Sequence, residues 1–138
     1  MSNSKTVYLT RKDHFSAAHQ LQNRKLSPEE NAKIFGKCLN VHGHNYILEI
    51  TIKGIPNTQT GMLINITDFK KIILDEVLNH LDHKFIDEDV EYFHNVPSTC
   101  ENISIWIWNQ IVKHLPTNVS LHRVKLCETE NNYAEFYG

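Results

Sequence analysis

The stretch HGHNYILEITIK, residues 42–53, decides the fold and carries the chemistry of this chain. Its apolar side chains Leu48, Ile50 and Ile52 alternate with others, which predicts a strand with one buried face. His42 and His44 are two residues apart, so on an extended strand both imidazoles point the same way and can converge on one ion. Gly43 between them has no side chain and lets another backbone approach closely.

A third histidine, His19, ends another strand-like run, FSAAH at residues 15–19. Three imidazoles without a fourth protein ligand are typical of a catalytic zinc site, which keeps one coordination position open. A structural zinc site would use four ligands, and the chain has no Cys-x-x-Cys. We therefore expect Zn²⁺ on His19, His42 and His44. Most single histidines are only hydrogen-bonded groups, and we interpret His14 and His122 in that way.

Composition sets the remaining bounds. At 138 residues, 41% apolar and 22% charged, the chain fits one domain over residues 1–138. A net charge of −2 gives no reason to expect nucleic acid or a membrane as the main partner. The three cysteines are odd in number and widely spaced, which disfavours a disulfide framework and favours a reducing compartment. Residues 1–5 lack an apolar signal core and no apolar run reaches membrane-spanning length, so we expect a cytoplasmic protein.

The other segments predict an α+β fold, with helices on one face of a single sheet whose exposed edges favour assembly. Ser27 and Pro28 are typical of a helix start, and Gly36 of its end. Further expected elements are a strand over 6–15, a third strand over 62–66 paired with the second, a helix from 67–68 to 81, a helix capped by Ser98 or Thr99 and ended by Pro116, and two strands within 120–137 joined at Asn131-Asn132.

Taken together, the motifs resemble the 6-pyruvoyltetrahydropterin synthase / 6-carboxytetrahydropterin synthase family. They occur in the family's order and cover essentially the whole chain: FSAAH (15–19), FGKC (35–38), HGHNY (42–46), TGM (60–62), LDHK (81–84), STCEN (98–102) and ETENN (128–132). The resemblance implies a T-fold, a four-stranded antiparallel sheet with two long helices on one face. It also implies a barrel formed by trimerisation, a homo-hexamer of two trimers, and a zinc-dependent lyase acting on 7,8-dihydroneopterin triphosphate.

The resemblance also assigns roles to individual residues. His19, His42 and His44 would bind zinc, Cys38 would be the general base, and Asp82 and His83 would complete a proton relay. Glu128 would anchor the pterin ring by accepting two adjacent N–H donors, with Glu101 and Thr99 helping to hold the ring. A glutamate in the first turn of a helix is also favoured by the helix dipole alone, so that interpretation of Glu101 stays open. Arg11, Arg24 and Lys84 are candidates for the triphosphate.

The product is predicted from one spacing. Animal 6-pyruvoyl enzymes resemble Cys-x5-His-Gly-His, whereas three residues separate Cys38 from His42 here, as in bacterial 6-carboxytetrahydropterin synthases of the queuosine pathway. We therefore expect 6-carboxy-5,6,7,8-tetrahydropterin, acetaldehyde and triphosphate. The alternative is the 6-pyruvoyl product of the tetrahydrobiopterin pathway, which the segments 26–38 and 129–132 favour. A distant alternative is a non-catalytic module that binds zinc and pterin, which would need no thiol base at Cys38.

Overall fold

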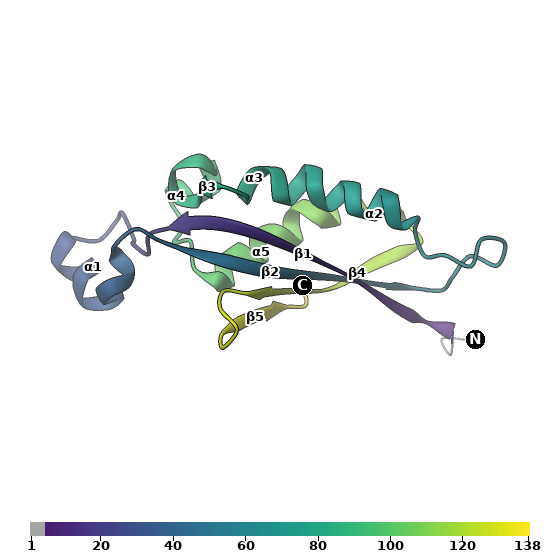
Figure 1. Cartoon of the computed structure of the whole chain (residues 1–138). Helices are drawn as coiled ribbons and strands as arrows, with labels where there is room; N and C mark the ends of the chain where they lie inside the picture. Colours follow the sequence, from purple (N-terminus) through teal and green to yellow (C-terminus); the bar gives the residue numbers. More distant parts are fainter. Residues whose placement is uncertain (1–4) are drawn as a thin grey trace.

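One twisted five-stranded sheet forms one layer of the molecule (Figure 1). The computed structural model describes residues 5–138. The strand order is β3-β1-β2-β4-β5. Four strands are antiparallel, and the two-residue β3 runs parallel to β1. Their bounds are β1 Val7–His19, β2 His42–Gly54, β3 Lys84–Phe85, β4 Val119–Cys127 and β5 Tyr133–Phe136.

The register between β1 and β2 brings three histidines onto one face of the sheet, at the end of the sheet where β1 finishes. Phe15 lies opposite Tyr46, Ala17 opposite His44, and His19 opposite His42. Side chains at alternate positions share a face, so His19, His42 and His44 all lie on the face that carries the core. The two predicted strand-like runs within residues 6–19 are one continuous strand of 13 residues.

Two long helical segments cover that face, as Figure 1 shows. The first runs through α2 Ile66–Ile73, the π-helical η3 Leu74–Leu78 and α3 Asn79–Leu81; the second is α5 Cys100–Val112. Asn65 and Thr99 cap them by accepting the N–H of Thr67 at 2.8 Å and of Asn102 at 3.1 Å. Within residues 5–138 no helix combines the length and the apolar character needed to cross a bilayer.

The core lies between this helical layer and the sheet. Its apolar side chains come from the middle of β2, from β4 and from the inner faces of both helical segments, and their burial provides the main driving force for folding. The fully buried members include Tyr46, Leu48, Ile50, Ile52, Phe69, Ile73, Leu81, Ile103, Ile107, Ile111 and Leu126.

Shorter elements connect these layers. They are α1 Pro28–Phe35, η2 Gly36–Leu39, α4 Ile86–Asp89 and η4 Glu91–His94. The predicted start of α1 is confirmed, because Ser27 and Glu30 form a reciprocal capping box. Gly36 has φ +54°, a conformation that a glycine adopts without a steric penalty, and it marks the change from α1 to η2.

Two sequence-based expectations about the sheet are wrong. Residues 62–65 form no strand, because Asn65 caps α2 and Ile66 already lies in that helix. The backbone there is held in another way: the side-chain amide of Asn118 donates to the carbonyl of Leu63 at 3.1 Å. The expected four-stranded sheet has a fifth strand, β3, which is too short to leave a periodic signal.

Candidate active site

Three histidines converge where β1 ends and β2 begins. The ligating atoms of His19, His42 and His44 all lie within 4.8 Å of one another. The ring centroid of His19 is 4.5 Å from that of His42 and 5.2 Å from that of His44. Gly43 separates the last two, and a Cβ added there would lie 3.3 Å from the carbonyl oxygen of Ala17 on β1. The strand pairing thus brings His19 to the His42–His44 pair, from which it is 23 positions away in the sequence.

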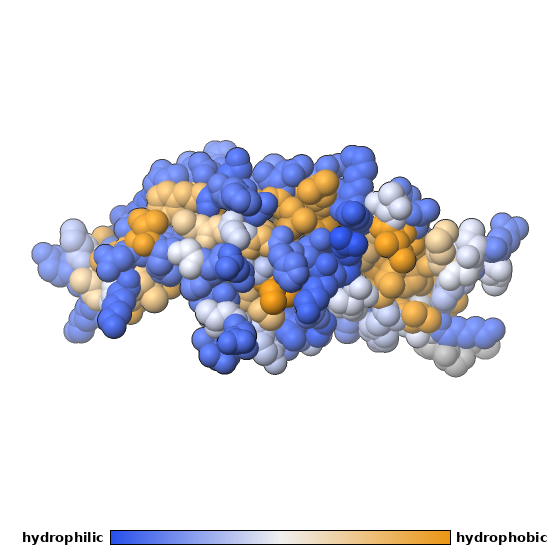
Figure 2. Space-filling view, viewed as in Figure 1, coloured by the Kyte–Doolittle hydropathy of each residue, from blue (hydrophilic) through white to orange (hydrophobic). Residues whose placement is uncertain are grey.

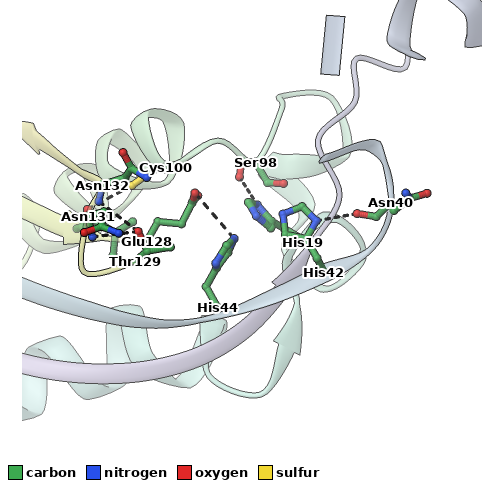
Figure 3. A network of polar contacts seen from close by, with 11 residues as sticks. His19, Asn40, His42, His44, Ser98, Cys100, Glu128, Thr129, Asn131 and Asn132 are labelled. Carbon is green, nitrogen blue, oxygen red and sulfur yellow. Dashed lines mark hydrogen bonds and ion pairs between the residues drawn. The ribbon is translucent and has the colours of Figure 1, made fainter. Parts of the chain in front are cut away.

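Backbone carbonyls orient two of the three rings. His19 Nδ1 donates to the carbonyl of Ser98, and His42 Nδ1 donates to that of Asn40, each at 2.7 Å (Figure 3). A carbonyl oxygen only accepts, so each Nδ1 carries the hydrogen and each Nε2 presents a lone pair. The Nε2 atoms of His19 and His44 are buried without a hydrogen-bond partner. Buried, unpartnered ring nitrogens this close to one another fit a divalent cation.

Burial favours the neutral form of two of these imidazoles, His19 and His44. His19 is fully buried, and that burial lowers its pKa below the ordinary value, against the opposing effect of the bond to Ser98. Burial also lowers the pKa of His44, while the nearby carboxylate of Glu128 raises it. Only a neutral imidazole offers a lone pair to a metal, so the surroundings favour the ligating form.

A pocket of about 700 Å³ adjoins the histidines. Its walls come from the start of α5 and from the hairpin between β4 and β5, and they include all three predicted pterin-binding residues, Thr99, Glu101 and Glu128. Glu128 Oε1 lies 3.8 Å from His44 Nε2, and Figure 3 shows its side chain extending towards that ring. The N–H of Glu128 donates to the carbonyl of Asn132 at 3.0 Å, which ties the residue to the predicted turn.

The other wall of this pocket carries a thiol that is not reactive. Cys100 Sγ donates to the carbonyl of Leu126 at 3.2 Å, and burial raises the pKa of the thiol to about 12. A thiol with such a pKa stays protonated at neutral pH. Tyr46 lies beneath the histidines, with its ring centroid 5.5 Å from that of His44, and its buried hydroxyl has no partner. Burial raises the pKa of that phenol.

The three residues expected in a proton relay lie in two places. Asp82 Oδ2 is 3.0 Å from His83 Nδ1, so the predicted carboxylate–imidazole pair is present. The N–H of Ser16 donates to Asp82 Oδ1 at 3.0 Å, and this bond is the main reason that the pKa of Asp82 is lowered. His83 has φ +61° and a side chain that is 83% exposed. Cys38 is exposed in η2, and no hydrogen bond among residues 5–138 joins it to the pair.

The sequence did not identify the groups that hold the histidine rings. The partners of His19 and His42 are backbone carbonyls, which every residue has, and Ser98 is 79 positions from His19. Two of the cations considered for the triphosphate already have partners: Arg11 pairs with Asp13 and Arg24 pairs with Glu88, each at 3.0 Å.

Known proteins resemble this chain over nearly its full length. A family model described as 6-pyruvoyl tetrahydropterin synthase matches residues 8–138. The 6-pyruvoyl tetrahydrobiopterin synthase of Dictyostelium discoideum is 47% identical, over 98% of this chain and 98% of that protein. The protein of that name from Homo sapiens is 45% identical, over 94% and 90%. The solved structure of the Caenorhabditis elegans 6-pyruvoyl tetrahydropterin synthase has a TM-score of 0.89 at 36% identity and covers 96% of each chain.

These relatives show that the expected 6-carboxy product is wrong. A relative named 6-carboxy-5,6,7,8-tetrahydropterin synthase, from Rickettsia typhi, is only 32% identical, over 94% of this chain. The spacing between Cys38 and His42 was a poor guide to the product. Cys38 lies in η2 and His42 begins β2, so the spacing reports only the length of the connection between these two elements. The chain belongs to the 6-pyruvoyl tetrahydropterin synthase family and is a lyase of the tetrahydropterin synthase type.

Proposed function

We propose that this protein is a zinc-dependent 6-pyruvoyl tetrahydropterin synthase that acts on 7,8-dihydroneopterin triphosphate. It eliminates triphosphate and shifts protons within the remaining molecule, so that the side-chain alcohols are oxidised to ketones as the pterin ring is reduced. The observation that carries the proposal is the pair of buried, unpartnered Nε2 atoms of His19 and His44, which lie beside a pocket containing Glu128. The names of the Dictyostelium and human relatives support the choice of product. We place the protein in the cytoplasm, a reducing compartment that suits its three free cysteines.

In this proposal His19, His42 and His44 hold the zinc ion. Their donor set fits the metal, since three imidazoles converge, the Nδ1 hydrogens of His19 and His42 are engaged by backbone carbonyls, and three protein ligands would leave one coordination position for substrate. Bound zinc supplies a Lewis acid that polarises oxygens of the substrate and makes the neighbouring C–H groups more acidic.

Glu128 anchors the pterin ring. Its carboxylate accepts the ring N–H and the adjacent amino group as a pair of charge-assisted hydrogen bonds. Thr99 Oγ1 already accepts the N–H of Asn102, so its hydroxyl hydrogen remains available to the substrate. Glu101 is exposed in the first turn of α5 and lines the same pocket. The ring thereby lies beside the histidines, close to the proposed metal.

Cys38 and the Asp82–His83 pair move protons. His83 Nδ1 faces Asp82, which leaves Nε2 as the atom that exchanges a proton, and the bond from Ser16 keeps Asp82 ionised. Cys38 takes the proton from the substrate side chain as a thiolate. Both Cys38 and His83 are exposed on the single chain. We therefore place them together at a subunit contact of a homo-hexamer, the dimer of trimers that the family resemblance implies.

Product analysis tests the proposal. Purified, zinc-loaded protein is incubated with 7,8-dihydroneopterin triphosphate, and the products are identified by mass, with His42→Ala as the metal-deficient control. We expect a 6-pyruvoyl tetrahydropterin and free triphosphate, and no acetaldehyde. A 6-carboxy pterin with acetaldehyde would contradict the choice of product. Stoichiometric binding of the pterin without release of triphosphate would instead show a binding module.

A further inference from the structure

One buried carboxylate has no part in the chemistry described so far. Asp87 lies in α4 and is 2% exposed, and within residues 5–138 no other Asp or Glu is buried. Its Oδ1 accepts two hydrogen bonds, from the N–H of Gln20 at 3.0 Å and from the hydroxyl of Ser98 at 2.8 Å. Removing a carboxylate from water is costly, so its retention calls for an explanation.

Both partners of Asp87 are joined directly to His19. Gln20 is the next residue in the chain, and the carbonyl of Ser98 accepts the Nδ1 hydrogen of His19. Ser98 itself is fully buried, and Figure 3 shows its backbone oxygen facing the His19 ring. Asp87 Oδ1 thus fixes the backbone behind His19 on one side and the residue that orients its ring on the other.

The bonds of Asp87 differ from those of an ordinary helix cap. They reach 67 and 11 positions along the sequence and connect α4 to the end of β1 and to the segment before α5. The local role belongs to Asp89 in the same short helix, because its Oδ2 accepts the N–H of Phe85 at 2.9 Å. Asp87 therefore adds a long-range constraint that α4 itself does not require.

We infer that Asp87 is a positioning residue for the proposed metal site. By fixing Gln20 and Ser98 it holds the His19 ring so that Nε2 faces His42 and His44. Groups that orient a metal ligand from outside the coordination sphere commonly control affinity, and their loss costs about 10–100-fold. The inference rests on the proposed zinc site and adds a residue that controls it.

Zinc affinity separates this role from a structural one. Apo forms of the full-length wild type, Asp87→Ala, Asp87→Asn, Ser98→Ala and Asp89→Asn compete for zinc with a chromophoric chelator. We expect Asp87→Ala and Ser98→Ala to bind zinc about 10–100-fold more weakly. Asp87→Asn should fall between them and the wild type, because an amide oxygen can still accept both bonds without the charge. Asp89→Asn is the matched control and should keep wild-type affinity.

A spectroscopic measurement accompanies the titration. The cobalt(II)-loaded forms of Asp87→Ala and Ser98→Ala, at full occupancy and with wild-type helix content, should show altered d–d bands because the His19 ring is less well oriented. If Asp87→Ala does not fold, Ser98→Ala tests the inference alone. This variant keeps the backbone carbonyl that accepts the His19 hydrogen and loses only the hydroxyl that donates to Asp87. Wild-type affinity and bands in Ser98→Ala, or equal weakening in Asp89→Asn, would overturn the inference. A wild type that binds no zinc would instead overturn the proposed function.

Discussion

At the scale of single residues, Cys38 and Cys100 show how surroundings assign different roles to the same side chain. Cys100 is half-buried and donates to a carbonyl, and burial raises the pKa of its thiol to about 12. Cys38 is exposed in a short 3-10 helix and donates to no carbonyl within residues 5–138. A general base has to exchange its proton readily, so Cys38 is the thiol that suits the role.

Cys38→Ala is therefore expected to separate binding from turnover. The variant should fold and bind zinc as the wild type does, because the three histidines are untouched. Its turnover should fall by about 10²–10⁴-fold, the usual contribution of a general base. Cys127→Ala, at the end of β4, is the matched control. A normal rate in Cys38→Ala would remove this thiol from the mechanism.

The pKa of His19 makes the stability of the metal-free protein depend on pH. Burial lowers this pKa in the folded state, so as pH falls below the ordinary value of 6.5 the unfolded chain takes up the proton first. The free energy of unfolding of the apo protein should therefore decrease as pH falls through that value. Chemical denaturation at several pH values measures this slope, and His19→Gln should reduce it. An equal slope in both proteins would show that His19 does not contribute.

The histidine motif could be recognised because ligand spacing on a strand is local. His42 and His44 share a face through the two-residue repeat of β2, which needs no knowledge of the rest of the chain. The partners of the rings could not be recognised, because a backbone carbonyl leaves no trace in the sequence. The sequence did not reveal Asp87 for a related reason, because its inferred role depends on hydrogen bonds from residues that are distant in the chain.

At the scale of elements, the sequence predicted the structure well where the residues that determine an element lie within or next to it. The capping box of α1 and the Asn131-Asn132 turn are read within a few residues, and both are present. The two-residue β3 and the four-residue α4 are formed by tertiary contacts with β1 instead. At residues 62–65 the sequence instead predicted a strand that does not form. This apolar run leads into α2, whose N-cap is Asn65.

Ser27→Ala tests the contribution of the α1 cap. The substitution removes the hydroxyl that accepts the N–H of Glu30 at 3.1 Å, and such losses cost about 1 kcal/mol. We expect a decrease of that size in the free energy of unfolding, measured by chemical denaturation, with zinc binding unchanged. Ser120→Ala, at an exposed position of β4, is the control and should change little. A Ser27→Ala protein as stable as the wild type would show that α1 frays without cost.

At the scale of the whole molecule, an edge of the sheet and an apolar patch near the start of β1 are surfaces that another subunit could cover. Within residues 5–138, β3 pairs with β1 only at Ala17 and Ala18, so the edge of β1 from Val7 to Phe15 lies open to pairing with another subunit. Figure 2 shows an apolar patch at the end where β1 begins, and Val7, Leu9, Met62, Leu63, Ile64 and Ile66 line a groove in the protein surface. The proposed hexamer would cover such surface and complete the relay.

Mixing variants tests whether Cys38 and His83 meet between subunits. Cys38→Ala and His83→Ala proteins, each inactive alone, are unfolded together and refolded. Random assembly of a closed symmetric oligomer leaves about one contact in four with both groups intact, so about a quarter of the wild-type activity should return. Two Cys38→Ala preparations treated in the same way are the control. No recovery in a mixture that assembles normally would place both residues within one subunit.

The account depends most on three imidazoles around one zinc ion. X-ray absorption spectroscopy of the zinc-loaded protein measures the ligands directly. We predict three nitrogen ligands at about 2.0–2.1 Å together with one further light atom, and no sulfur. A sulfur ligand at about 2.3 Å would place a cysteine on the metal and contradict the role given to Cys38. Fewer than three nitrogen ligands, or no tightly bound zinc, would contradict the site itself.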